Sequence, residues 1–145
     1  MPKTGSCLCG AVKYTVKSEI THAGACHCGM CRKWSGGIYI GIAVPGDGME
    51  IEGSENVTTF ASSEWAERGF CGKCGSNIYY RVTAPGPYQG TYHIGMGTLD
   101  DTDGVTVTEE IFTDLKPEGY AFDGNLKGMT EAEVMAMFAQ AGEGQ

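Results

Sequence analysis

The chain reads Ala25-Cys26-His27-Cys28-Gly29-Met30-Cys31-Arg32, which places three thiols within six residues. Two further cysteine pairs stand on either side of this stretch, Cys7-Leu8-Cys9 before it and Cys71-Gly72-Lys73-Cys74 after it. A short turn between two thiolates lets both sulfurs converge on one tetrahedral ion at ~2.3 Å. The spacings C-x-C, C-x-C-x-x-C and C-x-x-C therefore predict a zinc protein.

The composition predicts a single globular domain over residues 1–145, because this length is ordinary for one domain. Hydrophobic residues make up 41% of the chain, and its 23 glycines are more than twice the average share of about 7%. So many glycines are typical of a chain that turns often. The first residues hold no apolar signal segment, and no run of about 18 apolar residues exists. We expect a cytoplasmic protein with no membrane partner.

The cysteine count argues against a disulfide-stabilised protein, and the net charge argues against a protein that binds nucleic acid. An odd number of cysteines, here seven, favours metal binding over disulfides in a reducing compartment. The 18 acidic and 10 basic residues give a net charge of −8, and two zinc ions held by seven thiolates would make it −11. Such a surface repels a polyanion, so we expect no nucleic-acid partner even though zinc knuckles often bind nucleic acid.

Alternating apolar residues predict a mainly β fold of antiparallel strands. The clearest alternation places Val12, Tyr14 and Val16 on one face of a strand that leaves directly from the first cysteine pair. About seven strands are expected, over residues 11–16, 38–44, 49–52, 57–60, 77–82, 89–96 and 105–112. The predicted architecture is a distorted antiparallel sheet pinned by zinc.

A helix is predicted only at the C-terminus of the chain. Thr130 is a candidate N-cap, and Glu133 three residues later completes a capping box. Gly142 is the expected end of this helix. Its apolar stripe is predicted to consist of Ala132, Met135, Ala136 and Ala139.

The seven thiols can be divided between metal ions in two ways. A zinc ribbon would join Cys28 and Cys31 to the last pair, but 39 residues lie between Cys31 and Cys71, against about 15–20 in such ribbons. The other division gives a closed four-sulfur site and a separate three-sulfur site. It uses every cysteine and leaves one ion an open position, which is typical of catalytic zinc. The closed site is formed by Cys7, Cys9, Cys71 and Cys74, and the open one by Cys26, Cys28 and Cys31.

Four segments together resemble the glutathione-dependent formaldehyde-activating enzyme family, which shares the CENP-V/GFA domain. The similarity runs from about residue 5 to about residue 120 and rests on C-L-C-G at 7–10, C-H-C-G-M-C-R-K-W-S-G at 26–36, R-G-F-C-G-K-C-G-S at 68–76 and G-T-L-D-D at 97–101. The resemblance implies an Mss4-like β-tent with the same four-plus-three division of cysteines. It also implies a carbon–sulfur lyase that condenses formaldehyde with glutathione at the three-cysteine zinc.

The chain departs from the family pattern at two positions. Glu110 stands where many members have a histidine, and Tyr120 stands where they often have a tryptophan. Both lie far from the cysteines in the sequence. The departures therefore bear on the substrate and not on metal binding.

The chemistry expected of the open site follows from its charge. A zinc ion held by three thiolates carries a net charge of −1, which favours binding and ionising a fourth thiol over activating water. A thiolate so held would attack a small aldehyde and give a hemithioacetal. Three alternatives remain open: a second structural zinc completed by a His or Asp, a non-catalytic protein-binding module, and a thiolate–zinc redox sensor that loses its metal on oxidation.

Other polar and aromatic residues are weaker candidates. His27 is interpreted as a surface histidine; the alternative is that it points away from the metal and supports the neighbouring ligand residues. Arg32, beside Cys31, is interpreted either as a cation that offsets thiolate charge or meets a substrate carboxylate, or equally as a solvated side chain. His93 is interpreted as a core or surface histidine and not as a ligand. Core or rim positions are expected for Trp34, Trp65 and Tyr120. Asp100 is expected to cap the chain that follows it.

Overall fold

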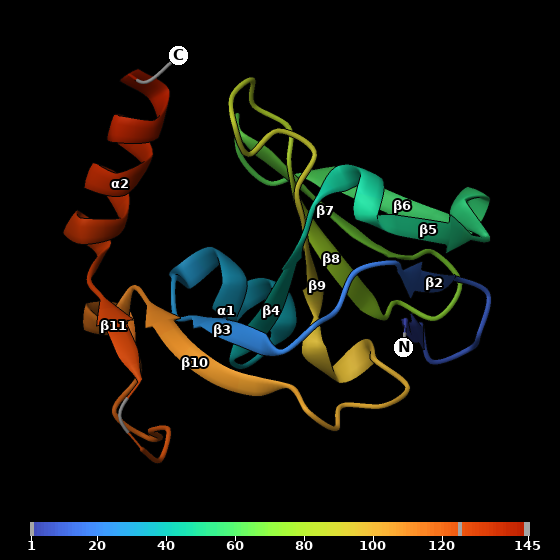
Figure 1. Ribbon diagram of the computed structural model, residues 1–145, viewed down its shortest axis with the longest axis horizontal. Coiled ribbons are helices and arrows are strands. Elements are labelled where there is room, and N and C mark those ends of the chain that lie inside the picture. The colour runs from blue at the N-terminus through green and yellow to red at the C-terminus, as the bar shows by residue number, and fades with distance from the viewer. Residues whose placement is uncertain (1, 125, 144–145) are drawn as a thin grey trace.

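The computed structural model describes residues 2–124 and 126–143, which form a mainly β protein with two α-helices (Figure 1). The strands are β1 (Lys3–Ser6), β2 (Lys13–Val16), β3 (His22–Cys26), β4 (Tyr39–Val44), β5 (Met49–Glu52), β6 (Val57–Ala61), β7 (Ala66–Cys71), β8 (Asn77–Val82), β9 (Tyr92–Gly95), β10 (Thr106–Ile111) and β11 (Lys127–Met129). The helices are α1 (Gly29–Ser35) and α2 (Glu131–Glu143), with 3₁₀ turns η1 (Gly46–Gly48), η2 (Ser54–Asn56), η3 (Met96–Thr98) and η4 (Thr113–Leu115). The mainly β prediction with a short C-terminal helix is confirmed.

The strands form two sheets. The smaller has the order β1-β2-β5, and the larger has the order β11-β10-β3-β4-β9-β8-β7-β6. Most neighbours are antiparallel, as predicted, but β10 runs parallel to both β3 and β11. In this register Glu110 lies opposite Ala25 and Ile111 lies opposite Cys26. The parallel pairing therefore brings a late segment of the chain beside the central cysteine stretch.

The core lies between the two sheets and follows the predicted alternation. Val12, Tyr14 and Val16 are all buried, with at most 2% of each side chain exposed. They pack in one cluster with residues of the larger sheet, which include Ile42, Val44, Ile78 and Ile94. Each of these buried side chains stabilises the folded protein by about 1.5–3 kcal/mol. This burial holds the smaller sheet on the larger one.

All seven predicted strands exist, but four strands and one helix were not expected. The strands β5 and β8 match their predictions at both ends. The strands β3 and β7 lack a regular apolar pattern because β3 is built from small residues and β7 buries an arginine, Arg68. The helix α1 has only seven residues, too few for an apolar period to show. The missed elements are therefore the short ones beside the cysteines, β3, β7 and α1, together with β1 and β11 at the sheet edges.

The C-terminal helix begins as predicted. The amide of Thr130 donates to Glu133 Oε1 at 3.2 Å, and the amide of Glu133 donates to Thr130 Oγ1 at 3.3 Å, which is the capping box. The predicted end was wrong, because α2 continues through Gly142 to Glu143. The predicted apolar stripe was also wrong: Ala132, Met135, Ala136 and Ala139 are exposed.

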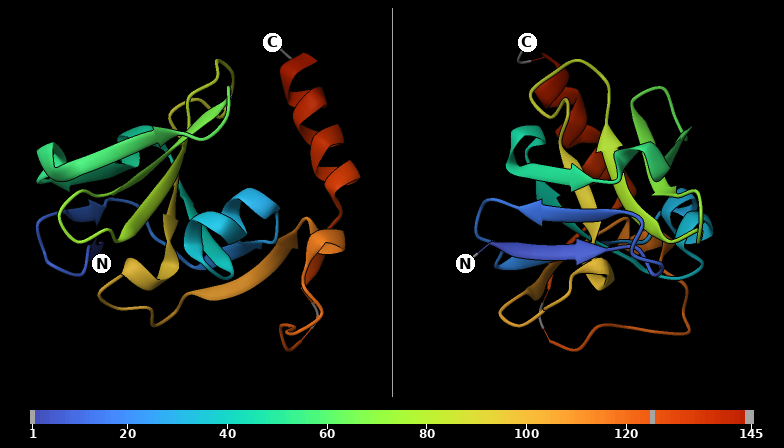
Figure 2. Two further views of the ribbon diagram at one scale, coloured as in Figure 1. Left: turned by 180° about the vertical axis from the view of Figure 1, so that it is seen from behind. Right: turned by 90° about the vertical axis from the view of Figure 1, so that its right-hand side faces the viewer.

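The reason for the misplaced stripe is the position of α2. Figures 1 and 2 show that the helix stands beside the sheets instead of lying across one of them. Its one fully buried side chain among the described positions is Val134, with 0% exposed. A helix held at one edge needs no continuous apolar face. Neither helix has the length and apolar character that a bilayer-spanning segment requires, over the residues that the structure describes.

Candidate metal centre

The four-cysteine group joins the ends of two distant segments. Cys7 and Cys9 lie in the turn between β1 and β2, whereas Cys71 ends β7 and Cys74 lies in the turn before β8. All four sulfurs lie within 4.8 Å of one another. The Sγ atoms of Cys7 and Cys9 are 3.7 Å apart, and those of Cys9 and Cys71 are 3.8 Å apart. A tetrahedral zinc with bonds of ~2.3 Å has sulfur–sulfur edges of ~3.8 Å, so the donor set fits zinc.

Hydrogen bonds from the surrounding chain reach three of the four sulfurs. The amide of Val12 donates to Cys7 Sγ at 3.3 Å, and the amide of Lys73 donates to Cys71 Sγ at 3.4 Å. The hydroxyl and the amide of Ser76 lower the pKa of Cys74 to about 5. The same hydroxyl accepts from the amide of Leu8 at 3.0 Å, which ties the two turns together.

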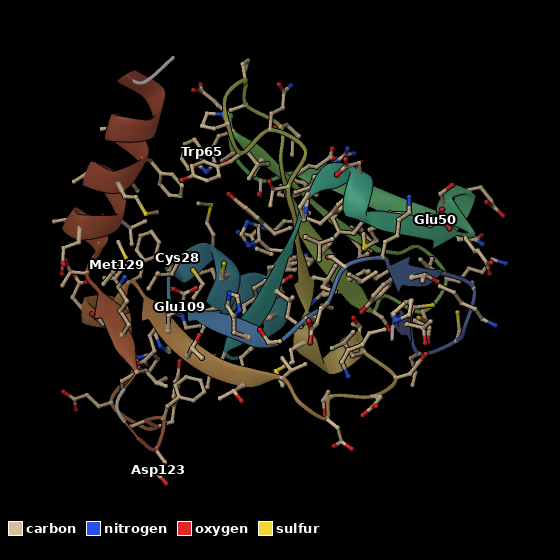
Figure 3. The ribbon with its side chains drawn as sticks, in the orientation of Figure 1. Cys28, Glu50, Trp65, Glu109, Asp123 and Met129 are labelled. Carbon is tan, nitrogen blue, oxygen red and sulfur yellow. The ribbon has the colours of Figure 1, made fainter. Side chains whose placement is uncertain are left out.

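The three-cysteine group is built on one short segment. Cys26 ends β3, Cys28 caps the N-terminus of α1, and Cys31 is the buried residue of that helix. Their sulfurs lie within 4.8 Å of one another, and the amide of Cys31 donates to Cys28 Sγ at 3.4 Å. Figure 3 places Cys28 on the side of the molecule where α2 stands. The groups are the predicted four and three, and the zinc-ribbon grouping is not formed.

The three thiols share their protons. Hydrogen bonds with Cys26 and Cys31 lower the pKa of Cys28, whereas hydrogen bonds with Cys28 and Cys31 raise the pKa of Cys26. One thiolate therefore forms readily, and a divalent cation would favour the ionisation of the other two. Among the described residues no His, Asp or Glu joins these three sulfurs as a fourth ligand. The donor set fits a zinc ion with one position for an outside ligand.

A buried arginine lies against the three-cysteine group. Arg68 of β7 has 2% of its surface exposed, and its Nη1 and Nη2 donate to Cys31 Sγ at 3.5 and 3.6 Å. Its guanidinium also lies over the rings of Trp34 and Tyr80, 5.2 and 4.9 Å from their centroids. Arg32, for which a solvated side chain was one of the interpretations left open, is exposed on α1. Arg68 stood in the R-G-F-C segment, but nothing in the sequence showed that it points inward.

His27 is not a surface residue, which corrects its interpretation from the sequence. Only 1% of it is exposed, its Nε2 lies 2.9 Å from Glu110 Oε1, and its Nδ1 lies 3.3 Å from the Tyr120 hydroxyl. An ionised carboxylate only accepts, so Nε2 carries a proton and Nδ1 can accept from the tyrosine. Phe122 also packs on the imidazole, at 6.1 Å between ring centroids.

The two departures from the family pattern thus meet on one side chain. Glu110 and Tyr120 are distant from the cysteines in the sequence, but both contact His27, which stands between Cys26 and Cys28. The parallel pairing of β10 with β3 brings Glu110 there, whereas Tyr120 comes from the chain that follows β10. No local sequence signal could have revealed this contact.

The remaining candidates have structural positions. Burial lowers the pKa of His93 to about 4, so the imidazole is neutral at physiological pH. Trp34 packs on Arg68, whereas Trp65 is 45% exposed. Among the described residues Asp100 makes no capping bond to the chain that follows: its carboxylate accepts from the Thr4 hydroxyl at 2.6 Å and so ties the turn to β1.

Comparison with known proteins identifies the family. The sequence profile described as "Glutathione-dependent formaldehyde-activating enzyme" matches residues 2–115. The chain belongs to this family. Proteins similar to it include an "uncharacterized lyase" of Schizosaccharomyces pombe, 30% identical over 131 residues that cover 90% of this chain and 93% of that protein. A relative from Halomonas elongata that bears the family's name is 32% identical over 83 residues, 52% of this chain, and the chain spans 53% of its length.

A solved structure supports the fold. The crystal structure of a Rhodobacter sphaeroides protein superposes with a TM-score of 0.56 and 23% identity, and the match covers 72% of this chain and 99% of that one. Residues after 115, which include Tyr120 and α2, lie outside the part that the family profile matches. The cysteine groups therefore belong to the shared family domain, whereas the contacts of His27 with Tyr120 and Phe122 come from beyond it.

Proposed function

We propose that this chain is a zinc-dependent enzyme of the S-hydroxymethylglutathione synthase type, a carbon–sulfur lyase that joins a small thiol to a small aldehyde. A structural zinc would be held by Cys7, Cys9, Cys71 and Cys74, and a second zinc by Cys26, Cys28 and Cys31. The observation that carries the proposal is the three-sulfur group, which has no fourth protein ligand among the described residues. The family name supports glutathione and formaldehyde as the thiol and the aldehyde.

The side chains around the three-cysteine group suit thiol chemistry. When bound, zinc supplies the positive charge that favours the ionised form of a thiol in the fourth position. Cys28 and Cys26 are partly exposed, so the ligand position is accessible, whereas Cys31 is buried against Arg68. The thiol sulfur forms a bond with the aldehyde carbon, the carbonyl π bond breaks, and the oxygen takes the proton that the thiol released. The atoms balance as one thiol and one aldehyde giving one hemithioacetal.

The two cysteine groups would have different consequences for folding. The four-cysteine group closes a long loop, because 61 residues separate Cys9 from Cys71. The three-cysteine group lies within six residues and closes no such loop. Replacing Cys28 by Ser should therefore leave the sheets folded while it removes the chemistry.

The test measures metal and reaction together. The full chain is purified, its zinc is counted, and exchange between free and thiol-bound ¹³C-formaldehyde is followed by NMR with glutathione present. We expect two zinc ions per chain and a rate above that of the uncatalysed mixture. Cys28→Ser should lose this acceleration, whereas Lys33→Gln, an exposed change on the same helix, should retain it. A protein with both zinc ions and no acceleration with any small thiol would refute the proposal and favour a binding module.

A further inference from the structure

Arg68 is a buried cation whose partners do not include a carboxylate. Among the residues that the structure describes, no Asp or Glu lies within ion-pair distance of its guanidinium. Its Nε donates to the Ser62 hydroxyl at 3.1 Å, and both terminal nitrogens donate to Cys31 Sγ. A buried charge is stable only when it is paired and hydrogen-bonded. The counter-charge of Arg68 is therefore the three-cysteine group.

Arg68 contributes to the net charge of the site as a whole. Three thiolates and one divalent ion give a net charge of −1, and the adjacent guanidinium brings the sum to zero. An anionic fourth ligand then makes the unit −1, whereas without Arg68 it would make the unit −2. In a partly buried site this second negative charge is costly, because charges interact more strongly there than in water. A neutral fourth ligand does not add this repulsion.

We propose that Arg68 determines the ligand specificity of the three-cysteine site, so that its open position takes a thiolate in preference to a neutral nitrogen ligand. The inference rests on the proposed function, since it concerns the same metal position. Arg68 acts through Cys31 and does not touch the reacting atoms, so it is a positioning residue. Its planar fork suits this role, because both terminal nitrogens reach one sulfur while the rings of Trp34 and Tyr80 cover its faces.

The test compares two probes on the cobalt-loaded full chain. 2-Mercaptoethanol binds as a thiolate and releases its proton to the buffer, whereas imidazole binds as a neutral ligand. Their dissociation constants are read at one pH from the sulfur-to-cobalt absorption. We expect Arg68→Gln to raise the dissociation constant of 2-mercaptoethanol at least about tenfold and that of imidazole by less than about twofold. Arg68→Lys should keep the preference of the natural protein within about threefold, because the charge remains.

Arg32→Gln is the matched control, because it removes the same charge from an exposed position next to Cys31. It should change neither dissociation constant by more than about twofold, since solvent and salt screen exposed charges. Equal changes for both probes in Arg68→Gln, or the same loss of thiol preference in Arg32→Gln, would overturn the inference. If Arg68→Gln does not fold, Arg68→Met fills the space between the two rings and replaces it. If neither neutral variant folds, Arg68→Lys decides, because a lost preference there overturns the charge role and a retained one supports it.

A second measurement separates this inference from the proposed function. Loss of cobalt to a chelator should become at least about tenfold faster from the three-cysteine group in Arg68→Gln and stay unchanged at the four-cysteine group. If the natural protein responds to neither probe, the proposed thiol chemistry fails, and the rates of cobalt loss alone test the role of Arg68. Unchanged rates in Arg68→Gln overturn that role, and faster loss from the three-cysteine group alone supports it. If the natural protein binds the thiol and Arg68→Gln binds it equally well, the function stands and the inference about Arg68 is wrong.

Discussion

Replacing Glu110 by Ala tests whether the contact of His27 with β10 holds the cysteine stretch in place. The side chain of His27 is fully buried, and Glu110, 18% exposed, is its partner at 2.9 Å. A hydrogen bond to a charged group contributes about 1.5–3 kcal/mol, and losing one partner leaves a buried donor unsatisfied. Because Glu110 is partly exposed, water can replace some of what is lost. We therefore expect the free energy of unfolding to fall by about 1–2 kcal/mol.

The assay is urea unfolding of the zinc-loaded protein, with thermal unfolding as a second measure. For a protein of about 150 residues, 1 kcal/mol corresponds to about 2–4 °C, so Tm should fall by about 2–8 °C. Glu110→Gln keeps an oxygen that accepts from Nε2, so its loss should stay below about 1 kcal/mol. Glu109→Ala, an exposed change at the neighbouring position of the same strand, should stay within about 0.5 kcal/mol.

The contact should also affect the metal, because His27 stands between Cys26 and Cys28. In Glu110→Ala we expect faster chelator-driven metal loss from the three-cysteine group and no change at the four-cysteine group. Tyr120→Phe should couple with Glu110→Ala in a double-mutant cycle, since both partners contact one imidazole. If Glu110→Ala is no less stable than Glu109→Ala and releases metal at the natural rate, the reasoning about His27 is refuted.

Three other changes test the fold around the site. Cys74→Ser should give insoluble or molten protein, because metal binding at a loop-closing site contributes folding free energy of order 10 kcal/mol; a soluble variant with unchanged melting and full zinc would contradict this. His93, whose pKa burial lowers to about 4, should make stability fall between about pH 6.5 and pH 4 by up to about 3 kcal/mol, because the unfolded chain binds a proton there that the folded chain does not. Urea midpoints of His93→Gln should lose this pH dependence, and an unchanged slope would count against it. Gly69→Ala should lower the free energy of unfolding by more than about 2 kcal/mol, because its Cβ would lie 2.3 Å from the ring of Tyr79, whereas Gly97→Ala has open space and should be nearly neutral; similar urea midpoints for the two would disprove the close contact.

The sequence by itself determined the features that depend on local spacing. A short turn brings thiols two or three residues apart towards one point, so the cysteine pairs and the triple could be predicted to be sets able to hold a metal ion. Alternation with period two placed the core face of residues 12–16, and the capping box located the start of α2. These signals are local because each is set by backbone geometry over a few residues.

Only the tertiary structure decided which side chains surround the three-cysteine group. Arg68 arrives from β7 and contacts Cys31, 37 residues away in the chain, and Glu110 arrives from β10, which pairs with β3. The sequence carried no prediction for Arg68, and the interpretation of His27 as a surface histidine was wrong. Burial of a charged or polar group depends on the partner that satisfies it. That partner is set by the register of non-local strands, which no spacing within the cysteine stretch encodes.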